Sequence, residues 1–396
     1  MSRFGPLFAL IIIALCQIAC QSASVAVTSG FRDDGTGRYP QADPPVSWST
    51  DGNLLWKTSM PSWSNASPVL HVETNMLFVC SEPSQILRIA AGDGTIRWER
   101  SVADVTPKEA AGTHKTNGYT SATPVTDGRT VYTVFATGVV AAWDVSGKRK
   151  WARVVEVPDI DFGYSASPVL AGGLLIVHIN DLIGLDPATG KEVWRATSEM
   201  KYGSPVMTAI GTSEIVITPS GDAYRASDGQ QLAQGLGMLE FATPVVADGT
   251  LYFIEKRATA TKLPTSADAS FDDQQLWEAR IQGSRHYSSA VVHDGRVYAI
   301  SREEMFTILD AATGDILFEK KLDLGEGGNS AYASITLAGD KLFVGAESGT
   351  TAVLQPGAMY RKIGRSEIGQ WRSTPVFSGK RVYIRAYDFL YCFEKN

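Results

Sequence analysis

The stretch DPATGKEVW, residues 186–194, combines a turn with the beginning of a β-strand. Asp-Pro favours the start of a turn, Gly190 suits its end because glycine accepts left-handed backbone angles, and Val-Trp favours a pleated strand. Variants recur along the chain, as DAATGDILF at residues 310–318 and as DGTIRW at residues 93–98. A turn and an aromatic residue repeated in this way indicate a fold built from repeated units.

A second repeated motif, a small residue followed by Pro and Val, marks the other end of each unit. Two degenerate copies lack the proline and fill the one wide gap in the series, so that the unit occurs eight times with separations of 37–56 residues. The copies are Ser67-Pro68-Val69, Thr123-Pro124-Val125, Ser167-Pro168-Val169, Ser204-Pro205-Val206, Thr243-Pro244-Val245, Ser289-Ala290-Val291, Ser334-Ile335-Thr336 and Thr374-Pro375-Val376.

Between the two motifs, each unit contains short runs of β-branched and aromatic residues, such as VYTVF at residues 131–135. The closing aromatic stands four residues after a glycine in most units, as in Gly147 and Trp151. Four short strands in a unit of roughly 40–45 residues are typical of a β-propeller blade. The sequence therefore predicts an all-β, eight-bladed β-propeller in which each closing aromatic wedges between neighbouring blades.

The two ends of the repeated region are incomplete in complementary ways. Residues 53–57 (NLLWK) form a fourth strand without the three strands that should precede it, and residues 373–393 supply three strands without a fourth. Pairing the two segments would make one composite blade and leave no open end to the array. We therefore expect the ring to be closed by the N- and C-terminal strands.

These motifs resemble the pyrroloquinoline-quinone-like (PQQ-like) propeller repeat family. Its pattern Ala-x-Asp-x-x-Thr-Gly-x-x-x-Trp is matched by residues 184–194 except at the first position, and the resemblance extends from about residue 48 to residue 393. An eight-bladed, exported chain of this kind is most similar to the lipoproteins of the family that act in outer-membrane assembly. The resemblance thus implies a non-catalytic, protein-binding scaffold of the cell envelope with envelope protein partners.

The N-terminus has the pattern of a secretory signal, because Arg3 precedes an apolar run that ends near residue 19. QIAC at residues 17–20 resembles a lipobox, which would make residues 1–19 the signal peptide and Cys20 the lipidated residue. Cleavage after Ser24-Val25-Ala26 and an uncleaved anchor are the alternatives. We favour an exported, periplasmic lipoprotein held at the outer membrane by its lipid alone.

Three further expectations concern domain organisation. Residues 20–45 are predicted to form a tether and residues 46–396 the propeller, and the protein is expected to be a monomer. DDGTG at residues 33–37 lacks the carboxylate spacing of a calcium loop and the lysine of a phosphate loop, so a solvated turn is expected there. Cys80 and Cys392 lie in apolar, strand-like runs, where buried free thiols are favoured and a disulfide remains possible.

Composition and motifs exclude several kinds of partner and chemistry. The formal net charge of -6 and the lack of a long basic run argue against nucleic acid. The five histidines share no metal-ligand spacing, so no metal site is predicted. Quinone-dependent alcohol dehydrogenases of the PQQ-like family carry an adjacent Cys-Cys pair and calcium ligands, and this sequence has no adjacent cysteines. No cofactor and no catalytic residues are predicted; a PQQ-dependent dehydrogenase and a small-ligand- or glycan-binding propeller remain as alternatives.

The segments that lead into the first strands share an aromatic residue, and in this fold they should converge on one face around the central channel. Lys115, Lys201, Arg285 and Arg372 lie among them. Two interpretations stay open: the aromatics cap the core and plug the channel, or they form a binding face. The predicted binding residues are Trp63, Tyr119, Tyr164, Tyr202, Phe241, Arg285, Tyr287, Tyr332, Trp371 and Arg372.

Overall fold

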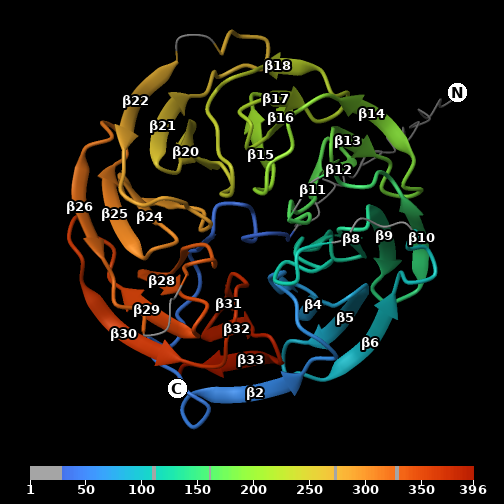
Figure 1. Cartoon of the computed structure of the whole chain (residues 1–396), viewed down its shortest axis with the longest axis horizontal. Coiled ribbons are helices and arrows are strands. Elements are labelled where there is room, and N and C mark those ends of the chain that lie inside the picture. The colour runs from blue at the N-terminus through green and yellow to red at the C-terminus, as the bar shows by residue number, and fades with distance from the viewer. Residues whose placement is uncertain (1–28, 109–112, 160–161, 272–273, 326–329) are drawn as a thin grey trace, which may run out of the picture.

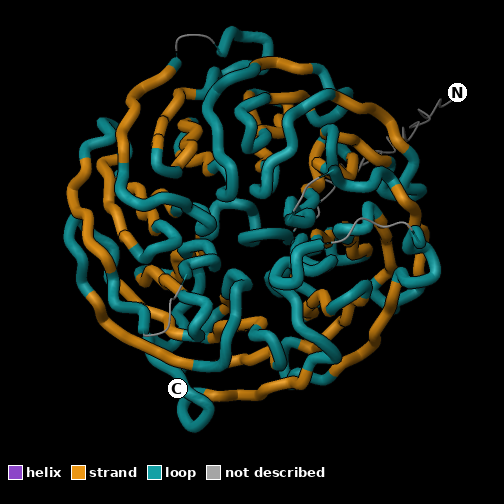
Figure 2. Tube along the Cα trace, in the orientation of Figure 1, coloured by secondary structure: helices purple, strands orange, loops and turns teal. Residues whose placement is uncertain are grey.

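The computed structural model describes residues 29–108, 113–159, 162–271, 274–325 and 330–396. The predicted signal peptide, the candidate lipidation site Cys20 and the first part of the predicted tether lie outside these residues. Strands and loops account for the whole of the described chain, which contains no helix (Figure 2). Eight sheets are arranged as a ring around a central channel, so the predicted eight-bladed β-propeller is confirmed (Figure 1).

Each of the first four blades is an antiparallel sheet whose strands follow one another from the channel outward. Blade 1 contains β3 (Val69–His71), β4 (Met76–Ser81), β5 (Gln85–Ala90) and β6 (Ile96–Ser101). Blade 2 contains β7 (Val125–Thr126), β8 (Thr130–Val134), β9 (Val139–Asp144) and β10 (Arg149–Val154). Blade 3 contains β11 (Val169–Ala171), β12 (Leu174–His178), β13 (Leu182–Leu185) and β14 (Glu192–Ala196). Blade 4 contains β15 (Val206–Ile210), β16 (Ser213–Ile217), β17 (Ala223–Arg225) and β18 (Gln231–Ala233).

The next three blades repeat this order, and blade 7 gains an extra inner strand, β1 (Arg38–Tyr39), which pairs with β27 in parallel. Blade 5 contains β19 (Val245–Ala247), β20 (Thr250–Ile254), β21 (Arg257–Lys262) and β22 (Gln275–Arg280). Blade 6 contains β23 (Val291–His293), β24 (Arg296–Ile300), β25 (Met305–Asp310) and β26 (Ile316–Lys321). Blade 7 contains β27 (Thr336–Ala338), β28 (Lys341–Gly345), β29 (Thr350–Leu354) and β30 (Lys362–Glu367).

Blade 8 is the composite blade expected from the two incomplete ends. Its inner strands are β31 (Val376–Ser378), β32 (Arg381–Arg385) and β33 (Phe389–Glu394), and its outer strand is β2 (Leu54–Ser59) from the other end of the chain. The antiparallel register places Leu54 opposite Phe393 and Thr58 opposite Leu390. The blue β2 lies beside the red β33 at the rim of the ring (Figure 1). Ring closure by the terminal strands is therefore confirmed.

The glycine and the tryptophan of the repeated motif contact each other across blade boundaries. Trp151 of blade 2 donates its indole N–H to the carbonyl of Pro187 in blade 3 at 2.9 Å, and its ring covers Gly190. Gly190 has a φ of 67°, and a Cβ there would lie 2.5 Å from Trp151, so only glycine fits. The same pairing joins Trp56 to Gly94, Trp98 to Gly147, Trp194 to Gly229, and Trp277 to Gly314. The predicted wedging role of the tryptophans is confirmed.

The small residues of the second motif join the blades around the channel. Each backbone N–H donates to the hydroxyl of the equivalent residue in the next blade, and Thr374 donates to Ser67 at 2.8 Å to complete the circle. At ~1 kcal/mol for a typical hydrogen bond, this circle adds appreciably to the cohesion of the blades. We call it the hydroxyl ring; its members are Ser67, Thr123, Ser167, Ser204, Thr243, Ser289, Ser334 and Thr374.

The segment of residues 29–37, here called the channel plug, crosses the centre of the ring (Figure 1). Ser29 bridges to Thr126 of blade 2, and the Arg32 guanidinium donates to the carbonyls of Ala290 and Ile335 ahead of blades 6 and 7. Arg32 is buried, and desolvation lowers its pKa to about 10, so it remains charged at neutral pH. The turn predicted at residues 33–37 is present, and Asp34 is exposed as expected of a solvated turn. The turn nevertheless packs against the wall of the channel, where Gly37 is buried.

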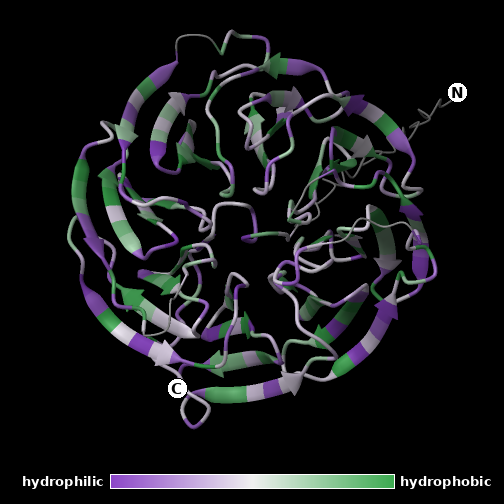
Figure 3. Cartoon of the chain, viewed as in Figure 1, coloured by the Kyte–Doolittle hydropathy of each residue, from purple (hydrophilic) through white to green (hydrophobic). Residues whose placement is uncertain are grey.

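The blades pack through apolar inner strands, whereas the outer strands alternate between buried and exposed positions (Figure 3). In β6, for example, Trp98 is buried and its neighbours on both sides are exposed. Cys80 and Cys392 are buried free thiols, as favoured from the sequence, and burial raises the pKa of each to about 12. Within the described ranges, no helix is long and apolar enough to cross a membrane.

Candidate functional site

A cavity of about 510 Å³ lies at the centre of the ring, on the face that carries the loops leading into the first strands. Its walls are these loops, and members of the hydroxyl ring line its lower part. Phe31 of the channel plug also lines it. Arg32 donates to the carbonyls of Ala290 and Ile335, which directly follow two members of the hydroxyl ring, Ser289 and Ser334. The plug therefore lies on the side of the hydroxyl ring that faces away from the cavity loops. The plug therefore makes this cavity a blind pocket rather than a pore.

Four aromatic rings in continuous contact form one wall of this central cavity. Tyr202 stacks on Phe241 with ring centroids 5.5 Å apart, and Phe241 meets Tyr287 edge to face at 4.9 Å. Tyr287 then stacks on Tyr332 at 4.7 Å with nearly parallel planes. Such contacts add roughly 0.5–1.5 kcal/mol each beyond burial. This aromatic arc is rigid because its rings support one another.

Two arginines cover the aromatic arc. The Arg372 guanidinium lies 4.1 Å from the centre of the Tyr332 ring and forms an ion pair with Glu347 at 2.7 Å. Arg285 lies 5.7 Å from the centre of the Phe241 ring and donates to the Tyr287 hydroxyl at 3.3 Å. Neighbouring rings and arginines therefore cover several ring faces of the arc; Tyr332, for example, lies between Tyr287 and Arg372. The tyrosine hydroxyls and the guanidinium groups offer hydrogen bonds to a ligand.

Carboxylates in the turns between second and third strands hold the loops of the aromatic arc. One oxygen of Glu255 accepts the backbone N–H groups of Glu240, Phe241 and Ala242 at 2.8–3.1 Å. Burial raises the pKa of Glu255, while these three donors oppose the shift. The arc is thus positioned by charge-assisted hydrogen bonds to the backbone.

Glu303 holds the next loop in the same way. Its carboxylate accepts the backbone N–H and the hydroxyl of Ser284, immediately before Arg285. Desolvation alone would raise the pKa of Glu303, but the bonds from Ser284 outweigh it and lower the pKa to about 2. Glu303 is therefore ionised at neutral pH and holds the loop there.

The opposite wall of the central cavity comes from the loops between blades 1, 2 and 3. The His114 ring contacts Phe162 with centroids 5.6 Å apart, and the Asn117 amide donates to the Phe162 carbonyl. Phe162 is 54% exposed at the cavity rim. The Arg372 guanidinium also donates to the Thr116 carbonyl, which joins this wall to the last blade.

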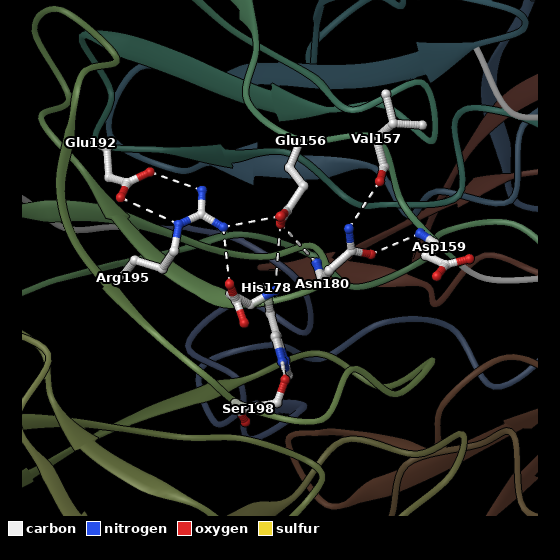
Figure 4. Close-up of polar contacts among 9 residues, drawn as sticks. Glu156, Val157, Asp159, His178, Asn180, Glu192, Arg195 and Ser198 are labelled. Atoms are coloured by element: carbon white, nitrogen blue, oxygen red, sulfur yellow. Dashed lines mark hydrogen bonds and ion pairs between the residues drawn. The ribbon is translucent and has the colours of Figure 1, made fainter. Parts of the chain in front are cut away.

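An ion-pair network fixes the loop that approaches Phe162 (Figure 4). Arg195 on β14 binds Glu156 at 3.0 Å, Asp181 at 3.1 Å and Glu192 at 2.9 Å. Asn180 holds the same loop through its hydrogen bonds with Glu156, Val157 and Asp159 (Figure 4). The network thereby anchors residues 156–159 to blade 3.

His178 lies beneath this network and points to the Ser198 carbonyl at 3.3 Å (Figure 4). Desolvation lowers the pKa of His178 to about 4, so the imidazole is neutral at physiological pH. It is therefore a core histidine rather than a charged member of the site.

Six of the ten predicted binding residues come together at the central cavity: Tyr202, Phe241, Arg285, Tyr287, Tyr332 and Arg372. The placement of Tyr164 and Trp371 on the pore face needs correction, because both side chains are completely buried in the core. Trp371 packs against Gly345, and Tyr164 lies in the cluster shared by blades 2 and 3. Trp63 contacts Tyr387 edge to face, and Tyr119 packs beside the same cluster as Tyr164; neither lines the cavity.

Several residues of the site did not stand out in the sequence. Phe31 belongs to a segment interpreted as a tether, and Arg302 and Phe162 lie in loops without a repeated signal. The carboxylate clamps do leave a pattern, because Glu82, Glu255, Glu303 and Glu347 each follow the end of a second strand by one to three residues. A search of the sequence for a glutamate at this position in each unit would have identified these carboxylates.

The fold is shared with quinone-dependent dehydrogenases, which raises the question of whether the residues present fit such a cofactor. In the aromatic arc, the Tyr332 ring lies between Tyr287 and Arg372, so it does not offer a face on which a planar quinone could stack. Among the described residues, no group of three His, Cys, Asp or Glu side chains could hold a metal ion. Of the carboxylates near the cavity, Glu240 is engaged with Lys201 and Glu347 with Arg372. The described donor set therefore does not fit the calcium ion that accompanies the quinone in such enzymes.

A closed ring of eight blades, seven of them four-stranded and one extended by β1, surrounds a central cavity and defines the class: an eight-bladed β-propeller of the PQQ-like type. The chain belongs to the family described as outer membrane protein assembly factor BamB, whose model matches residues 46–263 and 223–395. The resemblance predicted from the repeats is confirmed.

Individual relatives are distant. BamB of Yersinia pestis is 23% identical over 301 residues, covering 74% of this chain and 64% of that protein. The serine/threonine-protein kinase AfsK of Streptomyces griseus is 25% identical over 177 residues, covering 42% of this chain and 20% of the kinase. The chain thus matches less than two thirds of the length of either relative.

Two solved structures show the same fold. BamB from Moraxella catarrhalis superposes with a TM-score of 0.64 at 14% identity, covering 86% of this chain and 99% of that one. Quinohemoprotein alcohol dehydrogenase from Comamonas testosteroni gives a TM-score of 0.65 at 12% identity, covering 94% of this chain and 81% of the enzyme. Because the same propeller fold occurs in BamB and in a dehydrogenase, the function of this chain has to be argued from its site.

Proposed function

We propose that the protein is a non-catalytic scaffold of the cell envelope that binds protein partners through the face around the central cavity. The observation that carries the proposal is the aromatic arc with its two arginines, which combines large rigid side chains with fixed hydrogen-bond donors. Aromatic and arginine side chains of this kind carry most of the binding energy in protein interfaces. Membership of a family named for outer membrane protein assembly supports a protein partner over other ligands.

Replacing Phe162 and Tyr287 together by Ala should reduce recovery of the native partner at least about tenfold, because both side chains lie on the accessible face. The measurement is crosslinking in intact cells followed by purification and identification of the captured proteins. Thermal melting should shift by no more than a few degrees, since Phe162 is largely exposed.

A matched control is the pair Val193→Ala and Leu276→Ala, whose side chains are 55% and 50% exposed on the outer strands. This pair removes similar exposed apolar surface far from the cavity and should leave recovery unchanged. Equal recovery from the wild type and the Phe162/Tyr287 variant would contradict the proposed face.

We further propose that the chain is exported and tethered to the membrane through an acyl group on Cys20. The described propeller contains no amphipathic helix that would bind lipid by itself. Cys20→Ala should move the protein from the membrane fraction to the soluble fraction after cell lysis, as followed by immunoblotting. A variant that stays with the membranes through a high-salt wash would show that acylation is not the anchor.

A further inference from the structure

We propose that the central cavity receives an acidic peptide segment of the partner protein, bound by Arg285 and Arg302. The proposal rests on the proposed scaffold function and specifies the chemistry of its partner. Three observations carry it: two arginines without a direct carboxylate partner, walls that offer hydrogen-bond donors, and an exposed aromatic side chain at the rim.

The first observation is the charge balance of the cavity. Arg285, Arg302 and Arg372 all line it, whereas Glu240 is the one acidic residue in its described lining. Lys201 pairs with Glu199 at 2.7 Å and with Glu240 at 3.2 Å, and Glu347 pairs with Arg372. Within the described part of the chain, no carboxylate lies at ion-pair distance from Arg285 or Arg302, and Glu303 acts on Arg285 only at longer range. Arg285 and Arg302 are therefore the two arginines of the described lining that have no direct carboxylate partner.

The second observation is the orientation of the groups that line the cavity. Stacking covers the faces of Phe241 and Tyr332, so their edges, where the positive part of the aromatic quadrupole lies, remain beside the cavity. Arg285 is held by the Tyr287 hydroxyl and Arg302 by the Ser330 hydroxyl. Both guanidinium groups are thus positioned in advance and keep further N–H donors for carboxylates.

The third observation separates a peptide from a free anion. Phe162, which is 54% exposed, lies at the rim of the cavity. An exposed phenylalanine beside a charged centre provides contact area that a protein would use and a small anion would not. The volume of about 510 Å³ lies within the range that admits a ligand of several side chains.

The test is a fluorescence-anisotropy titration of the full folded chain with fluorescein-labelled hexaglutamate, and with labelled hexaglutamine as the neutral comparison. We expect hexaglutamate to bind at least about tenfold more tightly, and the preference to shrink as salt screens the charges. Arg285→Gln/Arg302→Gln should weaken hexaglutamate binding at least about tenfold while the melting temperature stays unchanged.

Arg129→Gln is the matched control, because Arg129 is an exposed cation in the turn after β7, at the far end of that strand from the cavity loops. It should bind hexaglutamate like the wild type. Equal binding of the two peptides, or unchanged binding by the double variant, would overturn the proposal. Full displacement by free glutamate at the same carboxylate concentration would also overturn it, in favour of a small-anion site.

A final arm separates this inference from the scaffold function. In cells, Arg285→Gln/Arg302→Gln should also lose the crosslinked partner. Partner recovery that persists after peptide binding is lost would refute insertion of an acidic segment and leave the scaffold function standing.

Discussion

Truncation of the chain after Asp388 is expected to unfold the entire propeller rather than one repeat. The truncation removes β33, which lies between β2 and β32 in blade 8, so β2 loses its pairing strand and β32 keeps β31 alone. Leu390, Cys392 and Phe393 are fully buried, and burial of a large apolar side chain contributes roughly 1.5–3 kcal/mol. The free energy lost with several such side chains is comparable to the whole net stability of a domain, about 5–15 kcal/mol.

Loss of β33 would also open the ring. The hydrogen bond from Thr374 to Ser67 and the contact of Trp56 with Gly94 both join blade 8 to blade 1 across this closure. Far-UV circular dichroism during heating should show no cooperative transition in the truncated chain. Removal of residues 395–396 alone is the control and should melt like the wild type. A truncated chain with an unchanged, cooperative transition would contradict ring closure as the basis of stability.

Trp371→Ala is expected to lower the free energy of unfolding by about 3–5 kcal/mol, the usual effect of deleting a large buried aromatic side chain. The indole is fully buried and packs on Gly345, which has no side chain that could move into the space left by the indole. Chemical denaturation followed by Trp fluorescence or circular dichroism measures the change. Trp371→Phe should cost clearly less, because it retains most of the buried ring.

Partner recovery distinguishes this core role from a binding role. The folded fraction of Trp371→Ala should capture the partner like the wild type, whereas Tyr287→Ala should reduce capture with little loss of stability. If Trp371→Ala kept its stability but failed to capture the partner, Trp371 would belong to the binding face and not to the core.

The sequence predicted the blades because their signals are local. Gly190 and Trp194 stand at a fixed spacing within one turn and strand, and the aromatic residue at the centre of an outer strand is readable within five residues. The closure of the ring followed from the phase of the repeat, since residues 53–57 had no other strand with which to pair. Such features depend on local backbone geometry and on the spacing of residues along the chain, and the sequence gives both directly.

The candidate site was predicted in part, for a related reason. The repeat places Tyr164, Tyr287 and Trp371 at equivalent positions, so the sequence treats them alike. The structure separates them because each loop adopts its own conformation, which is set by a contact from a different segment. Glu303 holds the loop of Arg285 and Tyr287 beside the cavity. Gly345, which lacks a side chain, leaves room for Trp371 inside the core.

By itself, the sequence determined the fold class, the number of blades and the place where the ring closes. Only the tertiary structure decided what occupies the channel. Residues 29–37 have the local composition of an exposed turn, yet Arg32 is buried against carbonyls that lie 258 and 303 residues further along the chain. No short-range preference encodes those contacts, because the carbonyls of Ala290 and Ile335 belong to two different blades and lie together only where these blades pack side by side.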